Sequence, residues 1–161
     1  MTEDDDHLYR RGVGIMLLNR GGKVFVAARI DNSADAWQMP QGGLDEGEDA
    51  WDAALRELGE ETGITPDLVE QVACSPQFHR YRLPDELLGK LWRGSNWVGQ
   101  KQAWYLCRFL GEDVDIDLAT EHPEFRAWKW VDPRELPELI VPFKRELYRE
   151  VLDAFADYLR G

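Results

Sequence analysis

One segment, residues 42–64, restricts the fold and the chemistry of this chain more than any other. It reads GGLDEGEDAWDAALRELGEETGI, and its apolar residues recur at the spacing of one helix face: Trp51, Ala54, Leu55 and Leu58. We therefore predict a helix over 49–61 that packs this face against a core. Gly63 follows as the expected C-cap, because glycine readily takes the left-handed conformation that ends many helices.

Three glutamates occupy a second face of the same predicted helix. Glu57, Glu60 and Glu61 are spaced by three and four positions, so their side chains project together. Crowded carboxylates raise one another's pKa values, and a hard divalent cation relieves the repulsion. Oxygen ligands of this kind suit Mg²⁺ or Mn²⁺. The helix is thus predicted to bury its apolar face and to present three carboxylates to a cleft.

Acidic residues at helical spacing are by themselves more often a solvated surface than a metal site, so the surrounding pattern decides. The pattern G-x5-E-x7-R-E-U-x-E-E-x-G-U, with U aliphatic, is met at every fixed position: Gly42, Glu48, Arg56, Glu57, Leu58, Glu60, Glu61, Gly63 and Ile64. The segment therefore resembles the Nudix box of the Nudix hydrolases. This resemblance implies an α/β (α+β) Nudix fold, a mixed β-sheet sandwiched between α-helices, and metal-dependent hydrolysis of phosphoric anhydrides.

The resemblance also implies roles within the box. Three glutamates would be catalytic metal ligands: Glu57, Glu60 and Glu61. They would hold Mg²⁺, or alternatively Mn²⁺, with more than one ion bound, and one of them or a downstream glutamate would be the general base. Arg56 and Glu48 would form a structural pair that fixes the loop on the helix. Gly42 would permit a close backbone approach near the metals.

Sequence outside the box narrows the resemblance to one subgroup of the family. The matching stretches are YRRGVGIMLLNR, DAWQMPQGGLDEGE, WVGQKQAWYL, PEFRAWKWV and VPFKRELYREVL. They are similar to the bacterial RNA pyrophosphohydrolases and the plant-type dinucleoside tetraphosphate hydrolases over residues 8–156. One substrate class is 5′-triphosphorylated RNA ends, whose conversion to 5′-monophosphate initiates mRNA decay. The alternative is dinucleoside polyphosphates, split with release of ATP.

Two further alternatives fit less well. A nucleotide-sensing Nudix domain without catalysis typically lacks one of the glutamates, and this chain retains them all. Hydrolases of oxidised nucleotides or of ADP-ribose share the box but not the flanking WQMPQGG and PEF stretches. The main expectation is therefore an enzyme of the RNA or dinucleotide subgroup.

The subgroup resemblance implies functional residues outside the box. Glu124, in the PEF stretch, would join the metal site as a fourth ligand or as the base, although a lone glutamate is ordinarily a surface residue. Arg10 and Arg29 would contact phosphate. Gln41 and Tyr81 would lie near the substrate cleft.

A base-binding slot is implied near the C-terminus, at Val141, Phe143 and Lys144. An aromatic ring and an aliphatic group can sandwich any base while a nearby cation binds an acceptor or a phosphate. The competing interpretation makes Val141 and Phe143 core residues of the last helix. The chain also departs from many bacterial members at Ala103, where they carry a lysine, and this leaves the polarity of one cleft wall open.

The remaining pattern predicts one domain in which strands are mixed with few helices. Apolar runs at 12–18 and 23–29 flank the turn sequence NRGG, which is typical of a hairpin. Other predicted elements are strands over 69–82, 103–110 and 126–131, and an amphipathic helix over 143–159. We place an acidic N-terminal tail at 1–7 and the Nudix domain at 8–161.

Charge and cysteine usage restrict the partners and the compartment. The net charge of −12 argues against a nonspecific grip on a nucleic acid backbone, so we expect no DNA partner. Cations nevertheless gather at 79–108 and 144–149, which suggests a bipolar surface. Cys74 and Cys107 are expected to be free buried thiols. With no apolar run long enough for a membrane and no signal peptide expected, we predict a cytoplasmic monomer.

Overall fold

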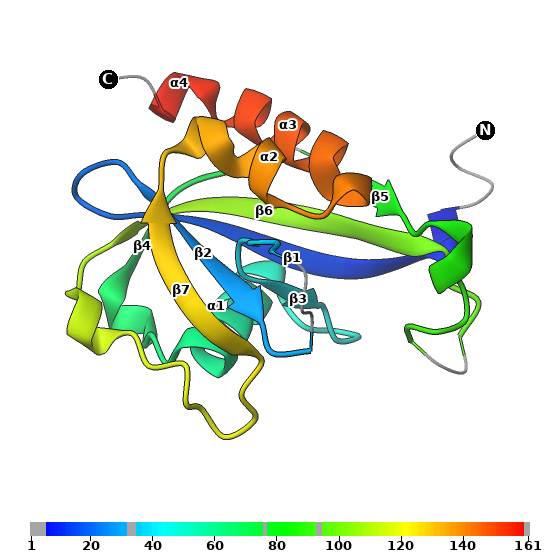
Figure 1. Ribbon diagram of the computed structural model, residues 1–161, viewed down its shortest axis with the longest axis horizontal. Helices are drawn as coiled ribbons and strands as arrows, with labels where there is room; N and C mark the ends of the chain where they lie inside the picture. Colours follow the sequence, from blue (N-terminus) through cyan, green and yellow to red (C-terminus); the bar gives the residue numbers. More distant parts are fainter. Residues whose placement is uncertain (1–5, 32–34, 76, 93–94, 160–161) are drawn as a thin grey trace.

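A computed structural model describes the protein over residues 6–31, 35–75, 77–92 and 95–159. Within these residues seven strands form one mixed sheet with helices on both of its faces (Figure 1). The strands are β1 (Tyr9–Leu18), β2 (Val24–Arg29), β3 (Gln41–Gly43), β4 (Val69–Cys74), β5 (His79–Arg82), β6 (Gly99–Phe109) and β7 (Phe125–Val131). The main strand order is β4-β6-β1-β2-β7, with β1 and β6 parallel. The predicted mixed sheet between helices is confirmed.

The helices form one layer on each side of the sheet. Helix α1 (Ala50–Thr62) lies on one face, and the C-terminal helices lie on the other (Figure 1). The latter are α2 (Leu136–Leu139), α3 (Arg145–Ala154) and α4 (Ala156–Leu159). Short 3-10 turns connect the elements: η1 (Asp6–Leu8), η2 (Pro66–Leu68), η3 (Asp85–Leu87), η4 (Asp113–Asp115), η5 (Pro133–Glu135) and η6 (Pro142–Lys144). The single helix predicted over 143–159 is therefore three pieces, interrupted at Phe155.

The hairpin between β1 and β2 forms as predicted. Leu18 pairs with Val24 in antiparallel register. The Asn19 side chain accepts hydrogen bonds from the backbone amides of Gly21 and Lys23, at 3.0 Å each. This side-chain cap satisfies the turn's backbone donors, which explains why NRGG reverses the chain here.

The single strand predicted over 69–82 is wrong. Two strands form instead, and both pair antiparallel with β6: β4 along its second half and β5 along its first. Strand β6 begins at Gly99, four residues before the predicted 103, and so is long enough to hold both partners. Periodicity alone did not reveal the break between β4 and β5, because both strands pair with β6.

Side chains of successive strand residues point to opposite faces of the sheet, and a separate hydrophobic core forms on each face. Met16 and Trp104 pack with the C-terminal helices, whereas Ile15 and Tyr105 pack on the side of α1. Cys107 is buried as expected, but Cys74 is exposed near the end of β4, so that expectation is wrong for Cys74. Among the described residues, no helix is both long and apolar enough to cross a membrane.

One buried hydrogen bond ties the C-terminal helix to the loop that precedes the box. The hydroxyl of Tyr148, in α3, accepts a hydrogen bond of 2.8 Å from the backbone amide of Met39. Both residues are buried, at 2% and 0% exposure. The bond therefore holds α3 against the entry to β3.

Tyr148→Phe is expected to lower the free energy of unfolding by about 1–3 kcal/mol, because it leaves the buried Met39 amide without an acceptor. Urea denaturation measures the change. Tyr158→Phe is the matched control: Tyr158 is 53% exposed, so the same loss of a hydroxyl should change little. Equal effects of the two substitutions would contradict the assignment.

Candidate active site

The helix that carries the glutamates is capped at both ends by its own sequence. The Asp49 carboxylate accepts a 3.1 Å hydrogen bond from the Asp52 amide at the N-terminus. Gly63 takes φ 72° at the C-terminus, and its amide donates to the Gly59 carbonyl. The predicted helix over 49–61 and its glycine cap are thus present.

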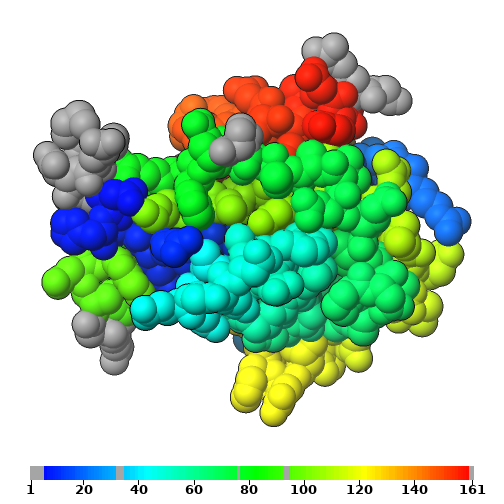
Figure 2. Space-filling view, turned by 180° about the vertical axis from the view of Figure 1, so that it is seen from behind, coloured from blue at the N-terminus to red at the C-terminus, as the bar shows by residue number. Residues whose placement is uncertain are grey.

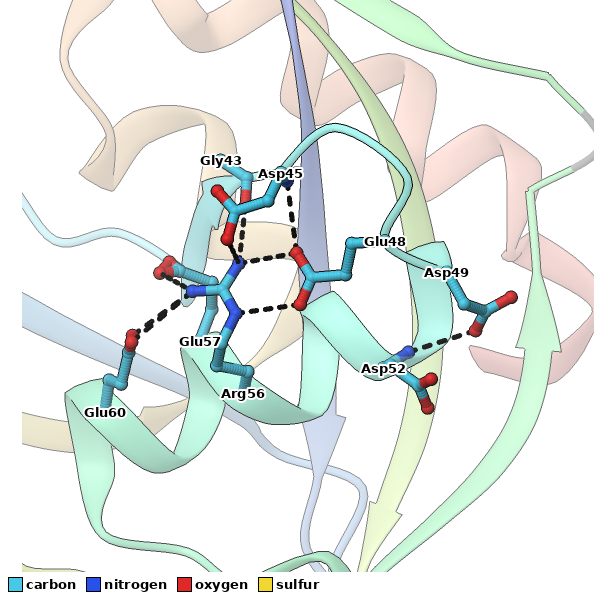
Figure 3. A network of polar contacts seen from close by, with 8 residues as sticks. All are labelled: Gly43, Asp45, Glu48, Asp49, Asp52, Arg56, Glu57 and Glu60. Atoms are coloured by element: carbon cyan, nitrogen blue, oxygen red, sulfur yellow. Dashed lines mark hydrogen bonds and ion pairs between the residues drawn. The ribbon is translucent and has the colours of Figure 1, made fainter.

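The Arg56 guanidinium joins the box loop to α1 (Figure 3). It donates two 2.9 Å hydrogen bonds to the Glu48 carboxylate and a third, of 3.0 Å, to the Gly43 carbonyl. Its remaining nitrogen lies 3.3 Å from both Glu57 and Glu60. Hydrogen bonding from Arg56 lowers the pKa of Glu48 to about 2, so this carboxylate stays charged. The structural pair is therefore formed.

Glu57 lies beneath the backbone of β3. A methyl group on Gly42 would overlap the Glu57 carboxylate, so any larger residue there would displace the Glu57 side chain. The side chain of Glu57 is 15% exposed, and burial raises its pKa to about 7, with Glu60 and Glu124 adding repulsion. Glu57 is therefore partly protonated at neutral pH, mainly because it is buried, and a bound cation would favour its charged form.

Glu61 is the most unusual carboxyl group in the fold. It is 2% exposed, and neither of its oxygens has a partner in good hydrogen-bond geometry, although the nearby Gln41 backbone partly offsets the rise in its pKa. Burial, followed by Glu57 and Glu124, raises its pKa well above the usual value. Buried carboxyl groups are normally paired or hydrogen-bonded, so an orphaned one requires a further partner.

The expectation that all three glutamates face an open cleft needs correction. Glu61 is buried and Glu57 nearly so, whereas the side chain of Glu60 is 54% exposed. The helix is rotated so that its small residues, Ala53 and Ala54, meet the sheet. Trp51 and Leu55, predicted to lie on the packing face, are consequently only half-buried. Close approach through the alanines brings Glu61 under the sheet.

The residues fit a divalent cation, although they do not form a compact cluster. Across the described part of the chain, no three His, Cys, Asp or Glu side chains are grouped closely enough to hold a metal ion. However, Glu57 raises the pKa of Glu61, and neither Glu61 oxygen has a partner in good hydrogen-bond geometry. Hard oxygen donors whose charges repel are the donor set that Mg²⁺ neutralises. The charge of Glu124 raises the pKa of both Glu57 and Glu61, so Glu124 lies close enough to interact with them.

Arg10 approaches the same group from β1. Its guanidinium lies where a methyl group on Gly43 would be, and it lowers the pKa of Glu57. Two indole rings hold it, those of Trp92 and Trp97, with its Cζ 5.7 and 5.9 Å from the ring centroids. Neither tryptophan was predicted from the sequence to lie at this site. Two indoles within the polar stretch LWRGSNW were the available signal.

Arg29 and Glu124 are brought together by an irregularity between β2 and β7. The register shifts between Ala28 and Arg29, and the Glu124 carbonyl accepts from the Ile30 amide at 2.8 Å. Arg29 pairs with Asp31 through hydrogen bonds of 2.8 and 3.0 Å. The charges of Glu124 and Glu61 raise the pKa of Arg29 further, so these groups share one site.

The predicted base slot lies against β5. The Tyr81 and Phe143 ring centroids are 5.9 Å apart, and the Lys144 ammonium lies 4.9 Å from the Tyr81 ring. Burial, with a contribution from Arg29, lowers the pKa of Lys144 to about 8. Val141 and Phe143 are half-buried against the C-terminal core, so the slot and the core interpretations both describe part of their surface.

A chain of amides lines the same region. Gln102 donates to Gln41 at 2.6 Å and to Gln100 at 2.8 Å. Tyr81 donates to Gln100 at 3.2 Å, and the Trp104 indole donates to Gln102 at 3.0 Å. Gln41 was predicted near the cleft, but Gln100 and Gln102 were not. They are buried, and their network holds Tyr81 and Gln41 in fixed positions.

Comparisons with known proteins identify the family of this chain. The family model described as NUDIX domain matches residues 8–151. The chain is 57% identical over 155 residues to the "RNA pyrophosphohydrolase" of Sphingopyxis alaskensis, covering 96% of this chain and 98% of that protein. It is 48% identical over 161 residues to the protein of the same name from Dinoroseobacter shibae, covering 99% and 100%.

Two solved structures share the fold. The E. coli dihydroneopterin triphosphate pyrophosphohydrolase superposes with a TM-score of 0.68 at 21% identity, covering 88% of this chain and 95% of that one. A C. elegans Ap4A hydrolase binary complex gives 0.63 at 20% identity, covering 92% and 98%. At these identities the likeness concerns the fold alone.

The crowded carboxyl groups predict a pH-dependent stability in metal-free protein. Glu57 keeps its proton up to about pH 7 when folded but only to about 4.5 when unfolded, so the folded state holds more protons between these values. The free energy of unfolding should therefore fall as pH rises through this window, by up to about 3 kcal/mol from Glu57. Denaturation in EDTA across this range measures the fall.

Glu57→Gln should reduce that fall, whereas Glu46→Gln, at an exposed position in the same loop, should leave it unchanged. Added Mg²⁺ should stabilise the wild type most at the high-pH end, where the carboxylates are charged. An unaltered pH profile in Glu57→Gln would contradict the assignment.

Proposed function

Because this chain belongs to the NUDIX domain family, we propose that it hydrolyses the 5′-triphosphate end of RNA, leaving a 5′-monophosphate and releasing pyrophosphate. In the cell this reaction would initiate mRNA decay. The observation that carries the proposal is the meeting of buried carboxyl groups with cations beside an aromatic slot. Near full-length relatives named "RNA pyrophosphohydrolase", at 48–57% identity, support this choice of substrate.

The acidic side chains of the site are proposed to hold the metal and to activate the attacking water. Mg²⁺ bound by the carboxylates would neutralise phosphate oxygens and stabilise the leaving group. Glu57, Glu60, Glu61 and Glu124 are the proposed ligands. One carboxylate of this group accepts the proton of the attacking water, whose oxygen bonds to phosphorus. The anhydride bond beyond that phosphorus breaks, and pyrophosphate leaves with the bonding electrons.

Arg10, Arg29 and Lys144 are proposed to bind the phosphate oxygens that the metal leaves free. Arg10 suits this role because the two indoles hold its guanidinium in place before substrate arrives. Lys144, with a pKa of about 8, is largely protonated at neutral pH and regains full charge when an anion binds beside it.

The base of the first nucleotide is proposed to stack on the Phe143 ring, in the slot that Phe143 forms with Val141 and Lys144. Aromatic stacking accepts every base, so the slot recognises a nucleoside without demanding a sequence. The same slot would serve a dinucleoside polyphosphate, which makes diadenosine tetraphosphate hydrolysis the alternative function. The monomeric state, the cytoplasmic location, and the number and identity of the ions stay predictions.

Turnover of 5′-triphosphorylated RNA with Mg²⁺ tests the reaction. Glu57→Gln and Glu61→Gln should each lower kcat by about a hundredfold or more, since each removes a carboxylate proposed to hold the Mg²⁺ that would stabilise the transition state. Glu46→Gln is the matched control and should retain wild-type turnover. Unchanged turnover in both site variants would overturn the metal-site assignment.

The substrate is tested by comparing kcat/KM for triphosphorylated RNA and for diadenosine tetraphosphate at equal enzyme. We expect RNA to be preferred. A preference for the dinucleotide of about a hundredfold, equivalent to about 2.7 kcal/mol of transition-state binding, would instead establish the alternative.

Phe143→Ala should raise KM for a triphosphorylated dinucleotide by about tenfold, since one stacked base contributes about 1–3 kcal/mol. The thermal midpoint should change little if the half-buried ring serves the slot. A large fall in the midpoint with an unchanged KM would instead assign Phe143 to the core.

A further inference from the structure

A row of cations crosses the sheet outside the site described above. Arg11 of β1 pairs in register with Lys101 of β6, and Lys101 pairs with Arg80 of β5. Residues directly opposite one another across strands point to the same face. The three side chains therefore stand side by side on the face that carries α1. We call Arg11, Lys101 and Arg80 the cationic row.

Like charges placed directly opposite destabilise a sheet, so this row needs an anion. Asp6, in η1, supplies one: its carboxylate pairs with Lys101 and lies 3.8 Å from Arg80. Hydrogen bonding from Lys101 lowers the pKa of Asp6, so the carboxylate stays charged. Asp6 thus occupies the position that an external anion would take.

Arg11 is the unsatisfied end of the row. It is exposed and forms no ion pair with any other residue that the structure describes. Its guanidinium carbon lies 5.8 Å from the centre of the Phe78 ring, and the Lys101 ammonium lies 5.9 Å from the same ring. Phe78 is 41% exposed. An exposed ring between two cations is the combination that binds the backbone and a base of a single strand.

The row adjoins the polyphosphate site. Arg11 follows Arg10, whose guanidinium lies beside Gly43, and the Arg11 carbonyl accepts a hydrogen bond from Leu44 of the box loop. The pairing of β1 with β3 ends at Gly12, so β1 presents an edge next to both arginines. Figure 2 shows the blue residues of η1 and early β1 exposed beside the cyan box loop on this face.

We propose that the cationic row and Phe78 bind the RNA chain downstream of its 5′ end, at a position that the Asp6 carboxylate occupies when no RNA is bound. A chain leaving the cleft past Arg10 would turn over the edge of β1 and place a phosphodiester on Arg11. This inference rests on the proposed function for its ligand. It also gives a local electropositive path to a protein whose net charge of −12 otherwise repels nucleic acid.

Two substitutions of opposite sign test the proposal with triphosphorylated RNA of about twelve nucleotides. Arg11→Gln removes a phosphate contact and should raise KM by about three- to tenfold, with a shallower salt dependence of kcat/KM. Asp6→Asn frees Lys101 and should lower KM by about two- to fivefold, with a steeper salt dependence. Neither should alter kinetics on a triphosphorylated dinucleotide, which is too short to reach the row.

Arg20→Gln is the matched control, because Arg20 is exposed in the turn at the opposite end of β1. The proposal is overturned if Arg11→Gln behaves like Arg20→Gln on the long RNA. It is equally overturned if Arg11→Gln changes dinucleotide and long-RNA kinetics by the same factor, since the contact would then belong to the cleft.

Fluorescence anisotropy separates failure of this inference from failure of the proposed function. A 5′-hydroxyl RNA of the same length lacks the reacting group, so its binding does not depend on catalysis. Arg11→Gln should weaken that binding by about the same factor as KM, and Asp6→Asn should tighten it. Absence of hydrolysis on every triphosphorylated RNA would reject the proposed function, whereas equal binding by wild type and Arg11→Gln would reject the row.

Discussion

The guanidinium of Arg56 is the contact on which the catalytic end of the molecule depends. It joins three elements that the chain alone would not hold together: the box loop through Glu48, the end of β3 through the Gly43 carbonyl, and the acidic face of α1. The planar guanidinium of arginine can donate to the Glu48 carboxylate and the Gly43 carbonyl at the same time, whereas the ammonium of a lysine lacks this fixed arrangement of donors. With this anchor in place, Gly42 lies directly over Glu57.

That anchoring explains how the fold tolerates two protonatable carboxyl groups in its interior. Glu57 and Glu61 would be easier to solvate if α1 tilted away from the sheet, yet the alanines and the Arg56 contacts keep it close. The protein therefore stores electrostatic repulsion at one place and holds Arg10 and Arg29 nearby. Under the proposed function, a cation and a polyphosphate would supply the charge interactions that the folded chain leaves incomplete.

Much of this was predictable from the sequence because local rules and the box pattern agreed. The helix with its Gly63 cap, the hairpin at NRGG and the Arg56–Glu48 pair each follow from residues close together in the chain. What could not be predicted depends on distant partners. The burial of Glu61 follows from how α1 is rotated on the sheet.

Two other features could not be predicted from the sequence because they also depend on distant partners. The split between β4 and β5 follows from the length of β6, and the indole pair around Arg10 follows from a loop more than eighty residues away. Periodicity reports which faces are apolar, but not which neighbour each face meets or how far a helix is turned on its axis.

The hydrogen bond from the Met39 amide to the Tyr148 hydroxyl joins the segment before β3 to the C-terminal helix α3. Tyr148 lies one turn beyond the residues that flank the aromatic slot, and Met39 lies two residues before β3, which covers Glu57. This hydrogen bond therefore connects the C-terminal helix to the backbone above the carboxylates, and under the proposed function it would couple the position of the nucleoside to that of the metal. Under the proposed function, the packing of the C-terminal helix would thereby help to set the length of polyphosphate that fits between the slot and the carboxylates.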